Sequence, residues 1–483
     1  QLTLEPGEYV LSVATCYGIP ESTLGSSTCS GGNGAMDYRL RIDSQSNWQE
    51  TNQSREWGIQ GLMVSLDESD PQAPQYQVIS NGRSWFEVET TDDLSGYLGK
   101  ELIGVHTFET LQVKGGASVD FGGDRVEVRD LANASISGEL MNADFTEEDL
   151  AAILDSPSVT GKLVISDQEI NGISAGNMSL VLDNVTVDGD LILDGTTLSA
   201  INVVQVTGEL ALLSESKITV PYPASGVFYS LQLNVIGHIS VEYGSSIDVT
   251  AKGYSAIYVG PDSVRYTREG CHGGDVYNGS NCTYGDYQRA RFAGSGSRHR
   301  RGGGVVELTT PALYLYGDIQ ADGQGGYGNG GAGGSIHLDV GELHGDGLIS
   351  ASGGDGNSSG YYAGAGGRIS LAVQNDYFAG SVQASSGAVG YASGAGTVYW
   401  VPTAGSQEYG DLTVNNGDRT TQNGSTPIKS VGRRVITGME EVAAGIWEVT
   451  VDGTPWNATN ESLGWGLQGR EVSLDAADEQ APL

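Results

Sequence analysis

The sequence predicts an all-β protein, and more specifically a right-handed parallel β-helix flanked by small β-rich junction modules. Two observations carry this prediction: a glycine excess among apolar strands, and two strand patterns that recur together. Glycine contributes 73 of the 483 residues, and hydrophobic residues make up 38%. Such a chain is too apolar for disorder and favours many strands joined by tight turns.

The first recurrent pattern begins with glycines and continues as an alternating strand. It is anchored on Gly304, Gly334, Gly367 and Gly396, so it recurs about every 30 residues. Alternation within each strand, as in residues 335–338, sends one side chain inward and the next outward. The glycine runs are expected to supply the positive φ and tight backbone passage that corners require.

The second pattern is an apolar residue followed by small residues and glycine. Three of its four copies, which begin at Ile319, Ile349 and Val382, advance in step with the first pattern. The fourth begins at Ile247. Because both patterns advance together, we expect stacked turns of a solenoid, with each strand lying on its counterpart one turn later.

Upstream the rhythm continues with fewer glycines. A Gly-acid-Leu triplet recurs at 189–191 and 208–210, one short turn apart, and residues 108–128 show the same strand–turn–strand order. The one helical signal is 146–154, where Thr146 and Asp149 form a capping-box pattern. We expect a short helix there, on a loop or over the solenoid.

A long motif occurs twice, at Trp48–Pro74 and Trp456–Pro482. Sixteen of its 27 positions are identical with no gap and at a constant offset, so the chain is interpreted as one period of a longer array. The tryptophans Trp48, Trp57, Trp456 and Trp465 are expected to be packing anchors rather than sugar platforms. The predicted domains are a junction module at 1–85, a glycine-rich β-helix at 86–405, and the start of the next junction at 406–483, which repeats about 36–74.

Residues 254–303 interrupt the period and form a predicted insertion. It holds a cysteine pair and a basic cluster: Arg289, Arg291, Arg298, His299, Arg300 and Arg301. The cluster is interpreted as arginines paired with the surrounding acidic surface. Two alternatives remain: a processing site at Arg298–Arg301, and a contact with an acidic face of a neighbouring subunit.

The net charge of −36 makes nucleic acid and anionic membranes unfavourable partners, because both would be repelled. It fits a solvated extracellular surface, with specific metal sites as the alternative. No segment has the length and apolarity of a membrane span, and no signal peptide is evident. Any targeting segment is therefore expected upstream or already removed.

The four cysteines form two close pairs, Cys16 with Cys29 and Cys271 with Cys282. Two local disulfides in an oxidising compartment are the expected arrangement. A zinc site is the alternative for the second pair, where His272 is adjacent, but a single histidine is a weak indication.

Asn-x-Ser/Thr sequons are enriched and indicate a secreted glycoprotein, with turn chemistry as the alternative explanation. The predicted N-glycosylation sites are Asn52, Asn133, Asn177, Asn184, Asn278, Asn281, Asn357, Asn423, Asn457 and Asn460.

No catalytic constellation is evident. The acidic candidates on the glycine-rich turns are Asp318, Asp322, Asp346 and Asp355, all in corner positions where aspartate is common for turn reasons. The glycine runs recur on every turn and lack a following helix, unlike a dinucleotide site. No catalytic residue, cofactor or metal ligand is therefore assigned, and a structural Ca²⁺ ion stays an alternative.

Together, the GGxGGxIxL strands, the xIxAxGG corners and the WGLxGxxVSLD junction resemble very large glycine-rich tandem-repeat proteins of the cell surface. The resemblance covers most of residues 100–483. It implies parallel β-helix proteins of microbes and protists that build adhesins, sheaths or extracellular filaments such as flagellar hairs (mastigonemes).

The leading functional hypothesis is a structural module of an extracellular glycoprotein filament or surface appendage. Its expected partners are further copies or repeats of itself and covalent N-glycans, without nucleic acid or membrane insertion. The first alternative is an adhesin that binds glycans through exposed aromatics such as Tyr361, Tyr362 and Tyr391. The second is a polysaccharide lyase or hydrolase that uses Asp318 or Asp346.

Overall fold

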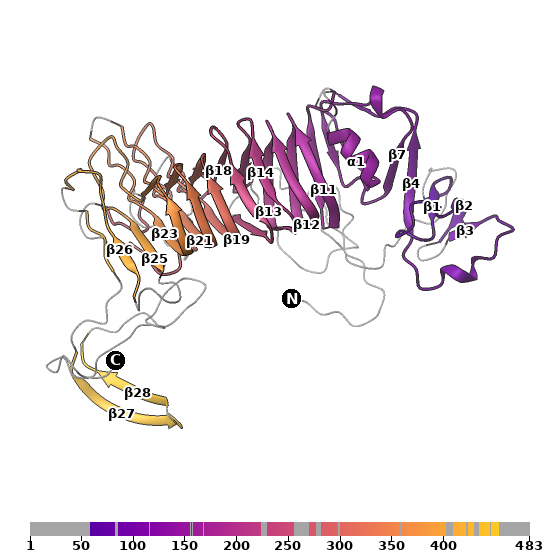
Figure 1. The fold of residues 1–483 in the computed structure, drawn as a ribbon. Coiled ribbons are helices and arrows are strands. Elements are labelled where there is room, and N and C mark those ends of the chain that lie inside the picture. Colours follow the sequence, from indigo (N-terminus) through magenta and orange to yellow (C-terminus); the bar gives the residue numbers. More distant parts are fainter. Residues whose placement is uncertain are drawn as a thin grey trace, which may run out of the picture. The chain divides into compact units, whose positions relative to one another are not determined.

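The computed structural model in Figure 1 is all-β, with 4% helix and 46% strand, and its largest element is a mostly parallel sheet of 19 strands. It describes residues 58–453, except 83–85, 115, 155, 157, 168, 224–228, 256–269, 277–281, 298–299, 358–359, 402–408, 422–423, 429–433 and 445. The chain divides into two compact units, one formed by Gln1–Gly61 with Val78–Val88 and one by Leu62–Gln77 with Glu89–Leu483.

The first unit contains a short antiparallel pairing in its described part. The second half of β2 (Gln75–Asn81) pairs with β3 (Phe86–Val88), with Val78 opposite Val88. The side-chain oxygen of Asn81 accepts a hydrogen bond of 2.9 Å from the Ile59 backbone nitrogen. Asn81 thereby ties the strand to the preceding turn.

The second unit starts with antiparallel strands and then changes to parallel pairing. β1 (Met63–Ser65) pairs antiparallel with residues 75–77 and with β4 (Ile103–Phe108), which pairs in parallel with β7 (Arg125–Val128). The remaining short elements here are η2 (Leu94–Tyr97), β5 (Gln112–Val113), η3 (Leu131–Asn133) and β8 (Ser135–Ile136). β5 and β8 also pair in parallel.

The 19-strand sheet forms a ladder in which strands stack on counterparts from the next passage of the chain (Figure 1). Its strands are β6 (Ser118–Asp120), β9 (Glu139–Met141), β10 (Lys162–Ser166), β11 (Glu169–Gly176), β12 (Ser179–Asp194), β13 (Thr197–Val206), β14 (Leu210–Leu213), β15 (Lys217–Thr219), β16 (Ser230–Val235), β17 (His238–Val241), β18 (Ser246–Asp248), β19 (Val305–Leu315), β20 (Asp318–Gln320), β21 (Ser335–Gly345), β22 (Leu348–Ser350), β23 (Arg368–Phe378), β24 (Ser381–Gln383), β25 (Thr397–Val401) and β26 (Asp411–Thr413).

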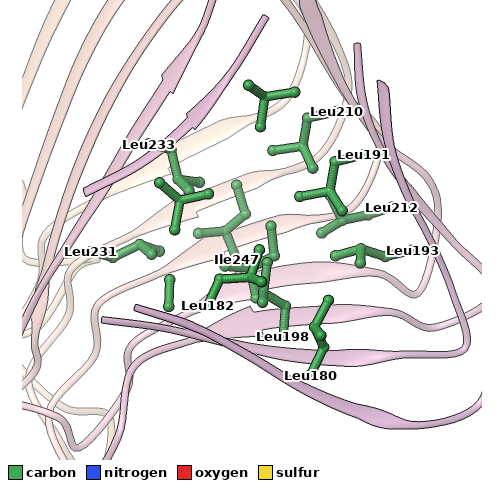
Figure 2. Close-up of a cluster of buried hydrophobic side chains, with 14 of the residues drawn as sticks. Leu180, Leu182, Leu191, Leu193, Leu198, Leu210, Leu212, Leu231, Leu233 and Ile247 are labelled. Carbon is green, nitrogen blue, oxygen red and sulfur yellow. The ribbon is translucent and has the colours of Figure 1, made fainter. Parts of the chain in front are cut away.

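Apolar side chains stack in register inside this ladder. Ile247, Ile319, Ile349 and Val382 occupy successive positions of one column. Figure 2 shows leucines from β12 to β16 converging on the same interior, and those at 180, 191, 198 and 210 are fully buried. The predicted stacking of both recurrent patterns is confirmed, because Val306, Ile336, Ile369 and Val398 form a second column in the same way. This continuous apolar interior is the main source of stability.

Turn length separates the ladder into two regions. In the upstream region Leu191 lies opposite Leu210, so the chain makes the short turn there that the sequence predicted. Downstream Ile336 lies opposite Ile369, so each turn uses a considerably longer piece of chain. The additional length of each long turn is a glycine-rich run between a short strand and the next long one, such as residues 321–334 between β20 and β21.

The glycine-rich runs stack on one another by direct backbone contact. Successive runs are hydrogen bonded, for example from Gly303 N to Ala332 O and from Gly333 N to Ala365 O, both at 2.9 Å. A Cβ built on Gly334 would overlap the carbonyl oxygen of Gly304, and one on Gly367 would overlap that of Gly334. None of these glycines has a positive φ. The expected tight backbone passage is therefore confirmed at these positions, where no side chain fits between the backbones. The expected positive φ is wrong for them and occurs at other glycines of the runs, including Gly326, Gly328, Gly360 and Gly390.

The predicted insertion leaves the ladder after β18, and the chain re-enters the ladder at β19. The register of the ladder continues across it, since Ile247 lies directly opposite Ile319. The described residues of the insertion cover the outer side of β21 and β23. Ser335 Oγ donates to Phe292 O at 2.6 Å, and Ser370 Oγ donates to Gln288 O at 2.9 Å. The simple alternation of buried and exposed side chains consequently fails here, since Ser335 and Ser370 are fully buried although they do not face the apolar interior.

The predicted helix is present as α1 (Glu147–Leu154). Thr146 accepts a hydrogen bond of 3.2 Å from the Asp149 backbone nitrogen, which is the expected N-terminal cap. The helix buries Leu150, Ile153 and Leu154 in the apolar interior of the ladder.

After β25 the chain no longer continues the parallel ladder. β26 pairs antiparallel with β25, and β27 (Ile436–Ala443) pairs antiparallel with β28 (Ile446–Val451) as a separate hairpin. The hairpin exposes apolar side chains, including Met439, Ile446 and Trp447.

Candidate functional site

Of the acidic candidates on the glycine-rich turns, Asp322, Asp346 and Asp355 join one turn to another, whereas Asp318 accepts a hydrogen bond of 3.4 Å from Gln320 on its own strand. Asp322 accepts hydrogen bonds from Ser350 Oγ and Ser352 N, both at 2.6 Å. Asp355 accepts from the backbone nitrogens of Ala388 at 2.5 Å and Val389 at 3.0 Å. These contacts are what turn chemistry would produce.

Asp322 also has an unusual electrostatic environment. Burial raises the pKa of its carboxyl, and the nearby Asp248 and Asp318 add to the increase, while the bonds from Ser350 and Ser352 oppose it. A carboxyl with this many fixed donors is well placed to hold the next turn. Asp346 has a different partner, because it accepts a hydrogen bond of 2.8 Å from the Tyr243 hydroxyl.

Within the insertion, Cys271 and Cys282 are joined in a disulfide, as predicted. The zinc alternative for this pair is thereby excluded, because both sulfur atoms are used in the covalent bond. The disulfide is buried with Val276 in a small cluster against which Tyr362 packs. Cys16 and Cys29, the other predicted pair, lie outside the described residues.

His272 lies next to the disulfide and connects the insertion to the glycine-rich stack. Its Nδ1 donates to Gly333 O at 2.8 Å, and its ring stacks on Tyr284 with centroids 4.7 Å apart. Burial, followed by the charge of Arg368, lowers the pKa of His272 to about 3. The imidazole is therefore neutral at physiological pH and acts as a structural donor.

Arg368 is also buried beneath the insertion, although it begins the regular strand β23. Its Nε donates to Tyr284 O at 2.9 Å, and its Nη1 donates to Thr397 Oγ1 at 3.3 Å. The guanidinium thus joins the insertion to the ladder.

Three described arginines of the predicted cluster differ from the prediction. Arg298 and His299 lie outside the described residues. Among the residues that the structure describes, Arg289, Arg300 and Arg301 form no ion pair with a carboxylate. Arg301 instead donates to Pro223 O at 3.3 Å and lies 5.8 Å from the Tyr222 ring. For Arg301, a backbone carbonyl and an aromatic ring replace the expected acidic partner, because its side chain packs along the loop that contains Tyr222 and Pro223.

The tyrosines predicted to bind glycans fall into two separate ring pairs. Tyr362 and Tyr391 have ring centroids 5.3 Å apart, and Tyr361 lies 6.2 Å from Tyr327, which the sequence analysis did not single out. Tyr327 is 68% exposed and Tyr391 is 41% exposed. These two pairs are called the loop tyrosine group below.

A second aromatic feature was missed entirely from the sequence. His238, Tyr314, His344 and Tyr377 form a column across four successive strands, with neighbouring centroids 5.5, 4.9 and 4.8 Å apart. The sequence does contain a sign of this column, because Tyr314, His344 and Tyr377 follow one another at the same spacing as the strand patterns. Tyr314, His344 and Tyr377 stack face to face and His238 meets Tyr314 edge to face, so the rings contact one another and stabilise the ladder.

Four of the predicted sequons fall on described residues. Asn133, Asn177 and Asn184 are exposed and Asn357 is half-buried, so the side chains of the first three are accessible to a glycan. Asn184 Nδ2 donates to Asp167 Oδ1 at 2.9 Å, a bond that the second hydrogen of the amide could keep after glycosylation. The predicted sites outside the described residues are Asn52, Asn278, Asn281, Asn423, Asn457 and Asn460, and so are the tryptophans Trp48, Trp57, Trp456 and Trp465.

Metal and membrane features can be judged only for the described part of the chain. It contains no group of three or more His, Cys, Asp or Glu residues that could hold a metal ion, so the calcium alternative gains no support there. None of its helices has the length and apolarity to span a membrane. Comparison with known proteins gave no match to a family model, a curated protein or a solved structure.

Proposed function

We propose that this chain is a structural module of an extracellular glycoprotein filament or surface appendage, built as a right-handed parallel β-helix. The observation that carries the proposal is the in-register stacking of strands from β9 to β25, in which each turn uses its neighbour as a template. A body of this kind lengthens by adding turns, without a change in the contacts of existing turns. The recurrence of the long motif at Trp456–Pro482 extends the same principle to whole modules.

An extracellular setting is supported by the disulfide of the insertion and by the exposed sequon asparagines. In this proposal the partners are further copies or repeats of the same chain, together with N-glycans. The charge of −36 would keep such a glycoprotein soluble and away from nucleic acid and anionic membranes.

Electron microscopy of native material, labelled with an antibody against this chain, tests the filament. We expect label at regular intervals along extracellular fibres. Isolated, unassociated particles in native extracts would overturn the proposal. An experimental structure tests the handedness separately, since left-handed turns would refute the fold assignment and leave the filament untouched.

Glycosylation is tested with variants that keep the asparagine. Thr186→Ala removes the sequon of Asn184 without touching its bond to Asp167. Ser135→Ala removes the sequon of Asn133 without touching its bond to Asp130. Each variant, made in a secreting eukaryotic host, should lose the mass of one glycan. An unchanged mass for both would remove this support for a secreted glycoprotein.

Glycan binding is a second candidate function, favoured by the exposed members of the loop tyrosine group, Tyr327 and Tyr391. Aromatic rings bind sugars by stacking on their apolar faces, and Tyr327 and Tyr391 are accessible. Binding on a glycan array should fall when both are changed to alanine and persist in a Tyr222→Ala control. No binding by the unmodified chain would refute this candidate.

A further inference from the structure

Tyr243 and Tyr316 form an exposed pair at one corner of the ladder. Tyr243 follows β17 and Tyr316 follows β19, two strands that pair in parallel. The ring centroids lie 5.5 Å apart at an interplanar angle of 43°, and the side chains are 68% and 41% exposed. Tyr316 N donates to Val241 O at 2.9 Å, so the backbone of the ladder holds the two phenols together.

A carboxylate from the next turn completes this corner. Asp346 follows β21, which stacks on β19, and its Oδ1 accepts the Tyr243 hydroxyl hydrogen bond of 2.8 Å. This hydrogen bond raises the pKa of Tyr243, because the protonated phenol can donate to Asp346 and the phenolate cannot. A phenol that loses an electron becomes strongly acidic, and Asp346 is positioned to receive its proton.

We propose that Tyr243 and Tyr316 are a site of oxidative cross-linking that yields a dityrosine between successive turns. The oxidant is a one-electron system of the haem peroxidase and hydrogen peroxide class. Each phenol loses one electron and one proton, and the two phenoxyl radicals form a carbon–carbon bond between the positions ortho to their oxygens. The hydrogen on each ortho carbon then moves to the oxygen of the same ring, which restores the aromatic phenol. The pair loses two hydrogens, and one peroxide is reduced to two waters.

The position of the pair gives the cross-link a structural consequence. The segment between Tyr243 and Tyr316 contains the whole insertion, so the register step from Val241 to Leu315 is more than twice as long as the downstream step from Leu313 to Leu343. A covalent bond that closes a longer loop removes more conformational freedom from the unfolded chain. Dityrosine at this corner would therefore stabilise the turn that joins strands far apart in the sequence, across the insertion.

Treatment of the dilute, purified chain with a haem peroxidase and limiting hydrogen peroxide tests the proposal. Peptide mapping should find Tyr243 linked to Tyr316. The linked species should have a mass two hydrogens below the summed masses of the two separate peptides, and it should show dityrosine fluorescence. Tyr316→Phe should abolish this product and Tyr377→Phe should not. Asp346→Asn should slow its formation several-fold. The oxidised chain should melt at a higher temperature than the untreated chain, and Tyr316→Phe should show no such increase.

The pair Tyr362 and Tyr391 is a matched internal comparison, because its centroids are 5.3 Å apart at the same angle of 43°. Tyr362 packs against the disulfide cluster, so we expect less coupling there. Oxidation of other tyrosines without the 243–316 product would overturn the proposal. Coupling that proceeds equally fast in Asp346→Asn would overturn the role of the carboxylate. The test uses isolated chains, so its outcome does not depend on a filament.

Discussion

In the turns between residues 179 and 213, leucine side chains fill the space between the strands, whereas the turns after residue 302 carry a second packed region made of glycine backbone. Leu180, Leu191 and Leu210 have no exposed surface, and they pack as side chains do in any apolar core. Gly334 and Gly367 are equally enclosed, but their neighbours are carbonyl oxygens of adjacent runs. The first region is packed by side chains, while the second leaves no space for a single methyl group.

The two regions also differ in what holds them together. In the leucine region, burial of apolar side chains adds to the hydrogen bonds between the paired strands. The glycine runs have almost no side chains to bury, so they rely on backbone hydrogen bonds such as that from Gly333 N to Ala365 O, and on the insertion that covers them. The His272 contact to Gly333 and the nearby disulfide show how the insertion compensates for the missing side chains.

The largest expected effect is in the apolar interior. Leu313→Ala, at a fully buried position between β17 and β21, should lower the free energy of unfolding by about 2–5 kcal/mol. Denaturant titration measures this change. Leu412→Ala, at a 42% exposed leucine of β26, is the control and should have a much smaller effect. Equal losses for both would mean that the apolar columns do not dominate stability.

Removal of the insertion disulfide should act mainly on the glycine region. The double variant Cys271→Ser/Cys282→Ser opens a short loop, and the chain-entropy relation gives a loss of about 3 kcal/mol. Hydrogen exchange should accelerate at Gly333, Gly366 and other backbone amides of the runs. Amides around Leu191 should keep their protection, and a uniform increase across both regions would contradict independent stabilisation.

A single added methyl group tests the close packing of the glycine backbone. Gly334→Ala should lower the unfolding free energy by about 1–3 kcal/mol, because the new Cβ overlaps the Gly304 carbonyl oxygen. Gly176→Ala is the matched control in the leucine region, where the nearest atom is the Asp194 carbonyl oxygen at 3.9 Å. That change should stay within about 0.5 kcal/mol. Thermal melts that shift equally for the two variants would refute the distinction.

Counted per pH unit, the smallest expected effect is a pH dependence from His272, whose pKa is lowered from 6.5 to about 3. Below about pH 6.5 the unfolded chain binds a proton at this residue and the folded chain does not. The unfolding free energy should therefore fall as the pH drops towards 3, by up to ~1.4 kcal/mol per pH unit. His272→Asn should flatten this slope relative to the unmodified chain. Identical slopes in the two proteins would contradict the assignment.

The candidate sites show how far local patterns reach. The sequence predicted the disulfide from proximity along the chain, and it singled out Tyr361, Tyr362 and Tyr391 as exposed aromatics. The corner of Tyr243, Tyr316 and Asp346 could not be found in this way, because its members are far apart in the sequence and the insertion separates the first two. Only the register of β17, β19 and β21 brings these side chains to one place.

The sequence by itself determined that the chain is all-β, where its strands repeat, and where a short helix is capped by Thr146. These features follow from local periodicity and turn chemistry, which depend on near neighbours. Only the tertiary structure decided which backbone makes the passage at the anchor glycines tight, and what the insertion covers. Gly334 has no unusual φ, so nothing in its local conformation requires glycine. The requirement comes from the backbone at Gly304, one turn away, because two main chains approach this closely only when neither carries a side chain between them.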